Sequence, residues 1–133
     1  MRNDAYEPIT YETEVAAREV VDAAYKVHSG LGPGLLEGVY EVCLCYELGK
    51  RNISFKNQIV LPVIYDGLEL DAGLRCDVIV NDSLIIEIKA VDKMIPVHEA
   101  QLLTYLKLTG IRLGLLINFN VPKIKDGIKR IVL

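Results

Sequence analysis

The amino-acid sequence predicts one α/β domain in which a central mixed β-sheet is flanked by helices, and three observations indicate this class. The chain has 133 residues, enough for one hydrophobic core but not for two ordinary domains, so residues 1–133 are expected to form a single unit. Its first third carries apolar residues at helical spacing, and most of the rest consists of short runs rich in β-branched residues. One more helical segment interrupts those runs, an order that favours helices packed on a sheet.

The N-terminal part begins with residues 1–9, which we expect to form a loose arm closed by Pro8. Thr10 is a good N-cap, because its hydroxyl can accept a hydrogen bond from the first turn of a helix. A helix is predicted from there to about Ser29, since apolar residues return at intervals of three and four. These residues are Ala17, Val20, Val21, Ala24 and Val27.

A glycine-rich break at residues 30–34 separates this helix from a second one, because Gly and Pro interrupt helical hydrogen bonding. The second helix is predicted from Leu35 to Leu48. Gly49 follows it and is expected to be its C-terminal cap, a position that favours glycine.

The remainder of the chain predicts a series of strands around one further helix. Ile53–Tyr65 is rich in β-branched residues, and Asp66-Gly67 after it is typical of a tight hairpin turn. A helix is expected from Pro96, which suits a first helical turn, to a stop at Gly110. The expected order is α, α, β, β, β, β, α, β, β, and the other predicted strands are Leu68–Leu70, Leu74–Val80, Leu84–Val91, Leu113–Phe119 and Ile128–Leu133.

Composition and charge narrow the class of protein. Hydrophobic residues make up 51% of the chain and charged residues 25%, as in soluble globular proteins. No apolar stretch reaches the roughly 18 residues of a membrane-spanning helix, and the start lacks the apolar core of a signal peptide, so a cytoplasmic location is expected. Three cysteines, an odd number, make a poor disulfide framework. The net charge of −3 predicts no basic surface for nucleic acid, although a bound divalent cation would reverse the local field.

Charged side chains stand inside two of the apolar predicted strands. Asp77 interrupts the strand Leu74–Val80, and Glu87 and Lys89 interrupt Leu84–Val91. Glu87 and Lys89 are two residues apart, so they share one face of their strand.

Whether Asp77 joins them depends on the register between the two strands. A three-residue loop at positions 81–83 pairs Val80 with Leu84 and places Asp77 directly opposite Glu87. A two-residue loop would instead move Glu87 to the opposite face of the sheet. The loop sequence Asn-Asp-Ser is compatible with the first arrangement.

In that register two carboxylates face each other with β-carbons about 5 Å apart, which is unfavourable unless a cation lies between them. Hard carboxylate oxygens without imidazole favour Mg²⁺ or Mn²⁺ over zinc. Lys89 beside the metal would position or activate a water molecule, or neutralise charge on a phosphoryl group. The alternative is a solvated sheet face with one Glu–Lys pair, which stabilises a protein by less than about 1 kcal/mol.

Two helices carry further polar residues. Glu37 and Tyr40 come just after the glycine-rich break, and Gln101 and Tyr105 lie one turn apart on one face of the later helix. The segment Gly-Leu-Leu-Glu-Gly-Val-Tyr at positions 34–40 resembles the Gly-x-x-Glu-x-x-Tyr signature of the GxxExxY proteins, a branch of the PD-(D/E)XK nuclease superfamily. The resemblance runs from about residue 11 to residue 132.

The resemblance implies a restriction-endonuclease-like fold with a metal site. Asp77 matches the acidic residue of the superfamily's first motif, with Cys76 where a proline often stands. Glu87 and Lys89 match its Glu-x-Lys element. The backbone carbonyl of Ile88, between them, would be a further metal ligand.

The helix residues also match the family pattern. Glu37 matches a helix-borne acid that reaches the metal directly or through water. Gln101 and Tyr105 match the Gln-x-x-x-Tyr element of RecB-like nucleases, which is thought to orient the site and contact nucleic acid. Tyr40 would either support Glu37 or pack in the core, and His98, one turn before Gln101, would either touch phosphate or cap its helix.

The resemblance implies a nuclease-type metal site but no particular substrate. Our main hypothesis is a metal-dependent nuclease that uses Mg²⁺, with Mn²⁺ as the second choice, and acts on DNA rather than RNA. The contrasting hypothesis is a catalytically silent module that binds nucleic acid or assembles with proteins while keeping the nuclease fold. So small a domain has little surface for clamping DNA, so a homodimer or a protein partner is an option. No membrane contact is expected.

Overall fold

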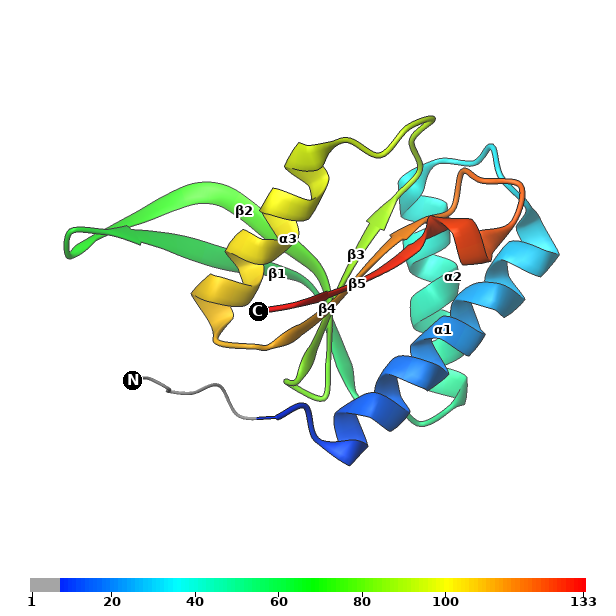
Figure 1. Cartoon of the computed structure of the whole chain (residues 1–133), viewed down its shortest axis with the longest axis horizontal. Helices are drawn as coiled ribbons and strands as arrows, with labels where there is room; N and C mark the ends of the chain where they lie inside the picture. The colour runs from blue at the N-terminus through cyan, green and yellow to red at the C-terminus, as the bar shows by residue number, and fades with distance from the viewer. Residues whose placement is uncertain (1–7) are drawn as a thin grey trace.

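The computed structural model describes residues 8–133, which form a five-stranded mixed sheet between two layers of helices (Figure 1). Neighbouring strands follow the order β1-β2-β3-β4-β5, and only β3 and β4 run parallel. The predicted fold class, one small α/β domain with a mixed sheet, is confirmed. Of the predicted arm, residues 1–7 lie outside the described residues. The elements are α1 (Tyr11–Leu31), α2 (Glu37–Lys50), β1 (Phe55–Tyr65), β2 (Leu68–Val80), β3 (Leu84–Lys89), α3 (Pro96–Thr109), β4 (Leu113–Asn118), the 3₁₀ turn η1 (Ile124–Gly127) and β5 (Ile128–Val132).

Each face of the sheet carries its own hydrophobic core. Helices α1 and α2 cover one face and α3 covers the other, while the β1–β2 hairpin extends beyond the helices as an arm (Figure 1). Val20 and Leu44 from the two helices pack with Ile86 of β3 in the first core. Leu102 and Leu106 of α3 pack with other sheet residues in the second core. The central strands are therefore buried on both sides, which explains their continuous apolar runs.

The helix boundaries agree with the sequence prediction to within two residues, with α1 ending at Leu31 instead of about Ser29 and α2 running from Glu37 to Lys50 instead of from Leu35 to Leu48. Thr10 is the N-cap of α1, and its hydroxyl accepts a hydrogen bond of 3.1 Å from the Thr13 N–H. Gly110 ends α3 in a left-handed conformation with φ 78°, as expected. The predicted cap at Gly49 is wrong, because α2 continues to Lys50 and Asn52 supplies the left-handed residue instead, with φ 57°. Within the described residues, no helix has the length and apolar character needed to cross a membrane.

The prediction of six strands is wrong by one. Leu68–Leu70 and Leu74–Val80, predicted as separate strands, belong to the single strand β2, which pairs with β1 on both sides of an irregularity. The irregularity is a shift in register between Leu61 and Val63 of β1, and Gly73 with φ 72° accommodates it on β2. The sequence break therefore marks a β-bulge rather than a turn.

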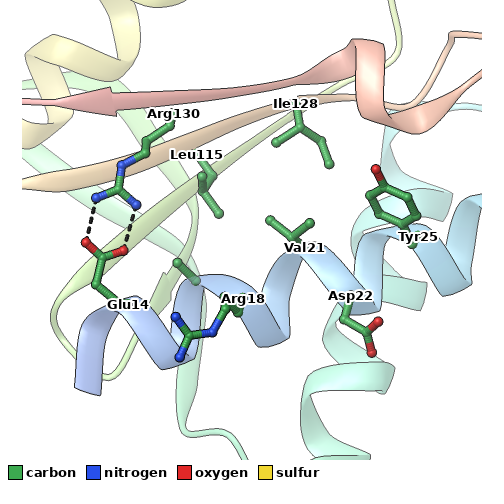
Figure 2. A pocket seen from close by; sticks show the side chains of 9 residues that line it. Glu14, Arg18, Val21, Asp22, Tyr25, Leu115, Ile128 and Arg130 are labelled. Carbon is green, nitrogen blue, oxygen red and sulfur yellow. Dashed lines mark hydrogen bonds and ion pairs between the residues drawn. The ribbon is translucent and has the colours of Figure 1, made fainter. Parts of the chain in front are cut away.

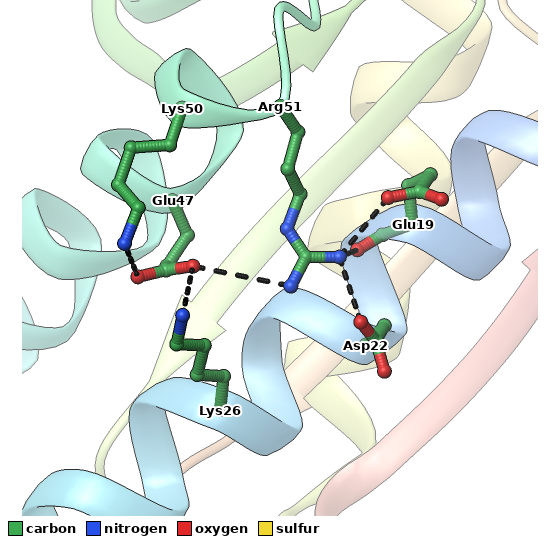
Figure 3. Close-up of polar contacts among 6 residues, drawn as sticks. All are labelled: Glu19, Asp22, Lys26, Glu47, Lys50 and Arg51. Carbon is green, nitrogen blue, oxygen red and sulfur yellow. Dashed lines mark hydrogen bonds and ion pairs between the residues drawn. The ribbon is translucent and has the colours of Figure 1, made fainter.

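A network of ion pairs joins the C-terminal end of α2 to α1 (Figure 3). The buried carboxylate of Glu47 contacts Lys50 at 3.3 Å, Lys26 at 3.7 Å and Arg51 at 3.9 Å. The Arg51 guanidinium continues to two exposed carboxylates of α1, those of Glu19 at 3.0 Å and Asp22 at 2.8 Å. Three basic side chains thus offset the charge of the buried Glu47 carboxylate.

The chain at the corner between η1 and β5 has space for glycine but not for a side chain at position 127. A β-carbon on Gly127 would overlap the carbonyl oxygen of Asn118, so we expect Gly127→Ala to lower the free energy of unfolding by about 3 kcal/mol. Gly38→Ala is the matched control, because Gly38 lies inside α2 with nothing within 4 Å of an added β-carbon. That variant should lose no stability, because alanine favours a helix more than glycine does. Urea unfolding measures both, and equal stability of the two variants would contradict this packing.

Candidate active site

The candidate site lies where the hydrogen-bonded ladder between β2 and β3 ends. Backbone pairing stops at the pair Val78–Ile86. Beyond it, the Asp77 N–H donates to Oε2 of Glu87 at 2.8 Å, and the Ile88 N–H donates to Oδ2 of Asp77 at 2.8 Å. Each carboxylate thus satisfies a backbone N–H of the opposite strand, and the two strands are joined here by side chains instead of backbone. We call this opening the β2–β3 gap.

The loop between β2 and β3 sets this arrangement. Val80 pairs with Leu84, which confirms the predicted three-residue loop. Asn81 and Asp82 in the loop both have φ 52°, a left-handed conformation that Asn and Asp tolerate better than most residues. When this register is continued by one residue, Asp77 lies opposite Glu87, as predicted for a three-residue loop.

Both carboxyl groups are buried, with Asp77 9% and Glu87 2% exposed. Burial raises the pKa of Glu87 to about 8, and the neighbouring charge of Asp77 adds to this effect. Burial also raises the pKa of Asp77 to about 6, although the hydrogen bond from Ile88 opposes it, and the charges of Glu41 and Glu37 push the pKa further up. Acids that ionise so reluctantly are stabilised in their charged form by a nearby cation.

A chain of hydrogen bonds connects β3 to α3 beside the carboxylates. Lys89 Nζ donates to Oε1 of Gln101 at 3.1 Å, and Nε2 of Gln101 donates to the Tyr105 hydroxyl at 3.0 Å. Lys89 is near enough for its charge to lower the pKa of both Asp77 and Glu87. Burial, followed by the charge of Glu87, raises the pKa of Tyr105 to about 12, so its hydroxyl stays protonated. The fold therefore brings together three predicted residues, one from β3 and two from α3.

The backbone carbonyl of Ile88 also points into the gap. In a β-strand the N–H and C=O of one residue face the same neighbour, and the Ile88 N–H faces β2. On the other side, the Lys89 carbonyl accepts a hydrogen bond of 2.9 Å from the Phe119 N–H, as the alternation requires. The gap thus presents two carboxylates and one carbonyl, and such hard oxygen donors suit Mg²⁺ or Mn²⁺.

The acidic residue predicted on the helix stands close to this donor set without joining it. Glu37 is the first residue of α2 and exposed, and its charge raises the pKa of both Asp77 and Glu87. In residues 8–133, however, no three Asp, Glu, His or Cys side chains lie close enough together to hold a metal ion. Glu37 can therefore act on a cation in the gap through an intervening water, an arrangement common for Mg²⁺.

Two residues of the site were not found by the sequence analysis. Nε2 of Gln58 donates to Oε1 of Glu41 at 2.7 Å and to Oδ1 of Asp77 at 3.4 Å. Glu41 follows Glu37 by one helical turn, and this spacing was a usable signal. Nothing in the sequence around Gln58 distinguishes it from other polar residues of an edge strand.

Tyr40 packs in the core and holds the glycine-rich loop before α2. Its ring is fully buried and stacks on Phe119 with ring centres 4.6 Å apart. Its hydroxyl donates to the Gly32 carbonyl at 2.7 Å and accepts from the Leu35 N–H at 3.1 Å. Of the two predicted roles, core packing is the one observed, and any support of Glu37 acts through this loop.

His98 forms a cap at the start of α3. The Ile95 N–H donates to Nδ1 of His98 at 3.2 Å, and the acceptor role of Nδ1 places the proton of a neutral ring on Nε2. Capping is therefore the observed one of its two predicted roles.

A separate hollow of about 570 Å³ lies between α1 and the β4–β5 edge of the sheet (Figure 2). Its apolar lining includes Val21, Leu115 and Ile128. Glu14 and Arg130 close one end with two hydrogen bonds of 2.7 Å each. Because none of the carboxylates of the β2–β3 gap lines this hollow, we assign the candidate chemistry to the gap.

Comparison with known proteins places the chain in a family. A family model described as the PD-(D/E)XK nuclease superfamily matches residues 14–131, and the narrower GxxExxY branch stays a prediction. A solved structure described as "Crystal structure of SSO0001" is 24% identical with a TM-score of 0.56, and the match covers 91% of this chain and 59% of that chain. This chain thus spans less than two thirds of that protein, and the likeness concerns the fold alone. No curated protein matches the sequence.

The raised carboxyl pKa values predict that stability falls as the pH rises. Glu87 and Asp77 have a higher pKa in the folded than in the unfolded chain, so the folded state binds more protons between about pH 4 and pH 8. The free energy of unfolding should therefore be lower at about pH 8.5 than at about pH 5, by about 5 kcal/mol. Urea unfolding at a series of pH values measures this profile.

Glu87→Gln tests the assignment, because glutamine keeps an acceptor for the Asp77 N–H but cannot ionise. We expect this variant to have a flatter pH profile and to exceed the wild type in stability at about pH 8.5. Glu69→Gln, at an exposed position of the β1–β2 arm, should keep the wild-type profile. A wild-type stability that rises over the same range would contradict the buried, uncompensated pair.

Tyr40→Phe separates the loop contacts of Tyr40 from its packing. The variant keeps the ring stacked on Phe119 but loses both hydrogen bonds of the hydroxyl, which should lower the free energy of unfolding by about 2 kcal/mol. Tyr46→Phe, which alters an exposed ring, should change little. Equal stability of the two variants, measured by urea unfolding, would show that the hydroxyl does not hold the loop.

Proposed function

The chain belongs to the PD-(D/E)XK nuclease superfamily, and on that premise we propose that it is a metal-dependent nuclease that hydrolyses phosphodiester bonds of DNA, with RNA less favoured. One observation carries the proposal. Two buried carboxylates, those of Asp77 and Glu87, replace the backbone ladder in the β2–β3 gap, and a lysine stands beside them. Buried acids in this arrangement weaken the fold unless a cation binds, which is expected of a functional site.

The proposed metal is Mg²⁺, with Mn²⁺ as the alternative. Asp77, Glu87 and the Ile88 carbonyl would hold it directly, and Glu37 would act through water. The donor set supports this choice, because all of these ligands are hard oxygens. The raised pKa values of Asp77 and Glu87 show that their charged forms are disfavoured, and a bound cation would stabilise those charged forms. A bound cation would lower the pKa of an attacking water and offset the charge of the phosphate.

The residues next to β3 would handle the substrate. The Lys89 ammonium, oriented by Gln101, can hold the attacking water in place or neutralise charge that develops on the phosphate. Gln101 links this group to the Tyr105 hydroxyl, which remains a protonated donor over the physiological range. A cytoplasmic location, and a homodimer or protein partner that adds surface for DNA, belong to the same proposal.

Calorimetric titration with Mn²⁺ tests the metal ligands. We expect the wild-type protein to bind the ion and Glu87→Gln to bind it at least about tenfold more weakly, because a charged ligand is lost. The exposed control Glu69→Gln should bind like the wild type. Unchanged affinity in Glu87→Gln would remove Glu87 from the metal site.

Cleavage assays on plasmid, single-stranded DNA and RNA test the chemistry. Lys89→Ala should lower the cleavage rate by about a hundredfold or more while changing Mn²⁺ affinity much less, since Lys89 is proposed to act on water or phosphate. Lys93→Ala, which removes an exposed lysine from the segment between β3 and α3, is the matched control and should cleave normally. A wild-type protein that binds the metal but cleaves none of the three substrates would favour the catalytically silent binding module.

A further inference from the structure

One residue inside a strand has a backbone conformation that its type disfavours. Gln58 of β1 has φ 52°, in the left-handed region where a β-carbon crowds the backbone. Gln58 makes no turn, so its strain has another cause. The other non-glycine residues with such angles in the described part of the chain are all Asn or Asp in turns, namely Asn52, Asp66, Asn81 and Asp82.

At this residue the alternation of side chains between the two faces of the sheet is reversed in both strands of the arm, β1 and β2. In a regular strand, residues two apart share a face. On β2, however, Val78 belongs to the core beneath α1 and α2, whereas Cys76 belongs to the core beneath α3. On β1, Phe55 packs against the first core and Ile59 against the second, although they are four positions apart and would share a face in a regular strand.

The reversed alternation brings Gln58 and Asp77 together. The ladder between β1 and β2 pairs Asn57 with Val78 and Ile59 with Cys76, and Gln58 and Asp77 are the residues between these pairs. The side-chain amide of Gln58 reaches across to Oδ1 of Asp77 at 3.4 Å. The left-handed backbone and the contact with the acid therefore occur at the same point.

The amide of Gln58 is itself anchored on α2. Its nitrogen donates to Oε1 of Glu41 at 2.7 Å, so its two hydrogens serve two carboxylates. The other oxygen of Asp77 accepts from the Ile88 N–H. Asp77 is thus held from β1 on one side and from β3 on the other, while Glu41 fixes the position of the amide.

Packing does not account for the conformation of Gln58. Its side chain is exposed, so no core contact requires it. If the reversed alternation of side chains were the only requirement at this position, glycine would adopt φ 52° with less strain. The side-chain contacts with Glu41 and Asp77 remain as the reason for a glutamine at this position.

We propose that Gln58 is a positioning residue whose amide, anchored on Glu41, aims the Asp77 carboxylate into the β2–β3 gap and thereby sets the affinity of the metal site. The part of this inference that concerns metal rests on the proposed function. The part that concerns the orientation of Asp77 does not, because the Ile88 N–H reports on it in the absence of any metal.

Gln58→Gly is the decisive variant, because it relieves the backbone while removing the amide. We expect the melting temperature to stay the same or rise. The Ile88 amide should exchange its hydrogen about tenfold faster, since its acceptor is no longer held, while the amides of β4 exchange as in the wild type. The dissociation constant for Mn²⁺ should increase about tenfold.

Asn52→Gly is the matched control, since it places glycine at another left-handed position, at the end of α2. It should leave both the exchange of Ile88 and the affinity for Mn²⁺ unchanged. Faster exchange of Ile88 in Gln58→Gly, in proteins that bind no Mn²⁺ at all, would support the positioning role and overturn the proposed metal site.

Two results would overturn the inference itself. The first is an Ile88 exchange rate in Gln58→Gly within about twofold of the wild-type rate, which would show that Asp77 does not depend on Gln58. The second is a lower melting temperature together with faster exchange throughout the sheet, which would show that Gln58 has only a structural role.

Discussion

The end of the ladder between β2 and β3 is the constraint on which the candidate site depends. Two antiparallel strands that separate leave backbone N–H groups without partners, and such buried groups cost free energy. Here the carboxylates of Asp77 and Glu87 accept those hydrogen bonds, so the strands can part without orphaned donors. The consequence is electrostatic, because two acids are now desolvated side by side and both have raised pKa values. The fold tolerates this since β3 remains paired with β4 along its whole length.

The two helical layers reach the gap from opposite faces of the sheet and bring different chemistry. Helix α3 supplies Gln101 and Tyr105, which with Lys89 form a side of the gap rich in hydrogen-bond donors. Helix α2 supplies Glu37 and Glu41, whose charges act on Asp77. Under the proposed function, the acidic side attracts the cation and the donor side receives the phosphate. At the other end of α2 from Glu37, the network around Glu47 joins this helix to α1 (Figure 3).

Departures from regular structure are concentrated at this point of the molecule. The left-handed backbone of Gln58, the reversed alternation of β1 and β2, the broken ladder and the buried acids all lie within a few residues of Asp77. Elsewhere the departures are fewer, namely the register shift at Leu61/Val63 and the buried carboxylate of Glu47, which three basic side chains contact. Locally unfavourable features cluster at functional sites in many proteins. Their clustering around Asp77 agrees with membership of a nuclease superfamily.

The sequence by itself determined most of the elements, the three-residue loop after β2 and the positions of Asp77, Glu87 and Lys89 on their strands. These follow from local periodicity and turn chemistry, which a short stretch of chain contains in full. Only the tertiary structure decided that Leu68–Val80 is one strand, that Glu37 stands beside the pair, and that Gln58 and Glu41 join the site. The polar run at residues 56–58 interrupts the apolar pattern of β1, but a polar run alone does not show that the side chains exchange faces there. That change depends on contacts with α2 and β2, segments that meet β1 only when the chain has folded.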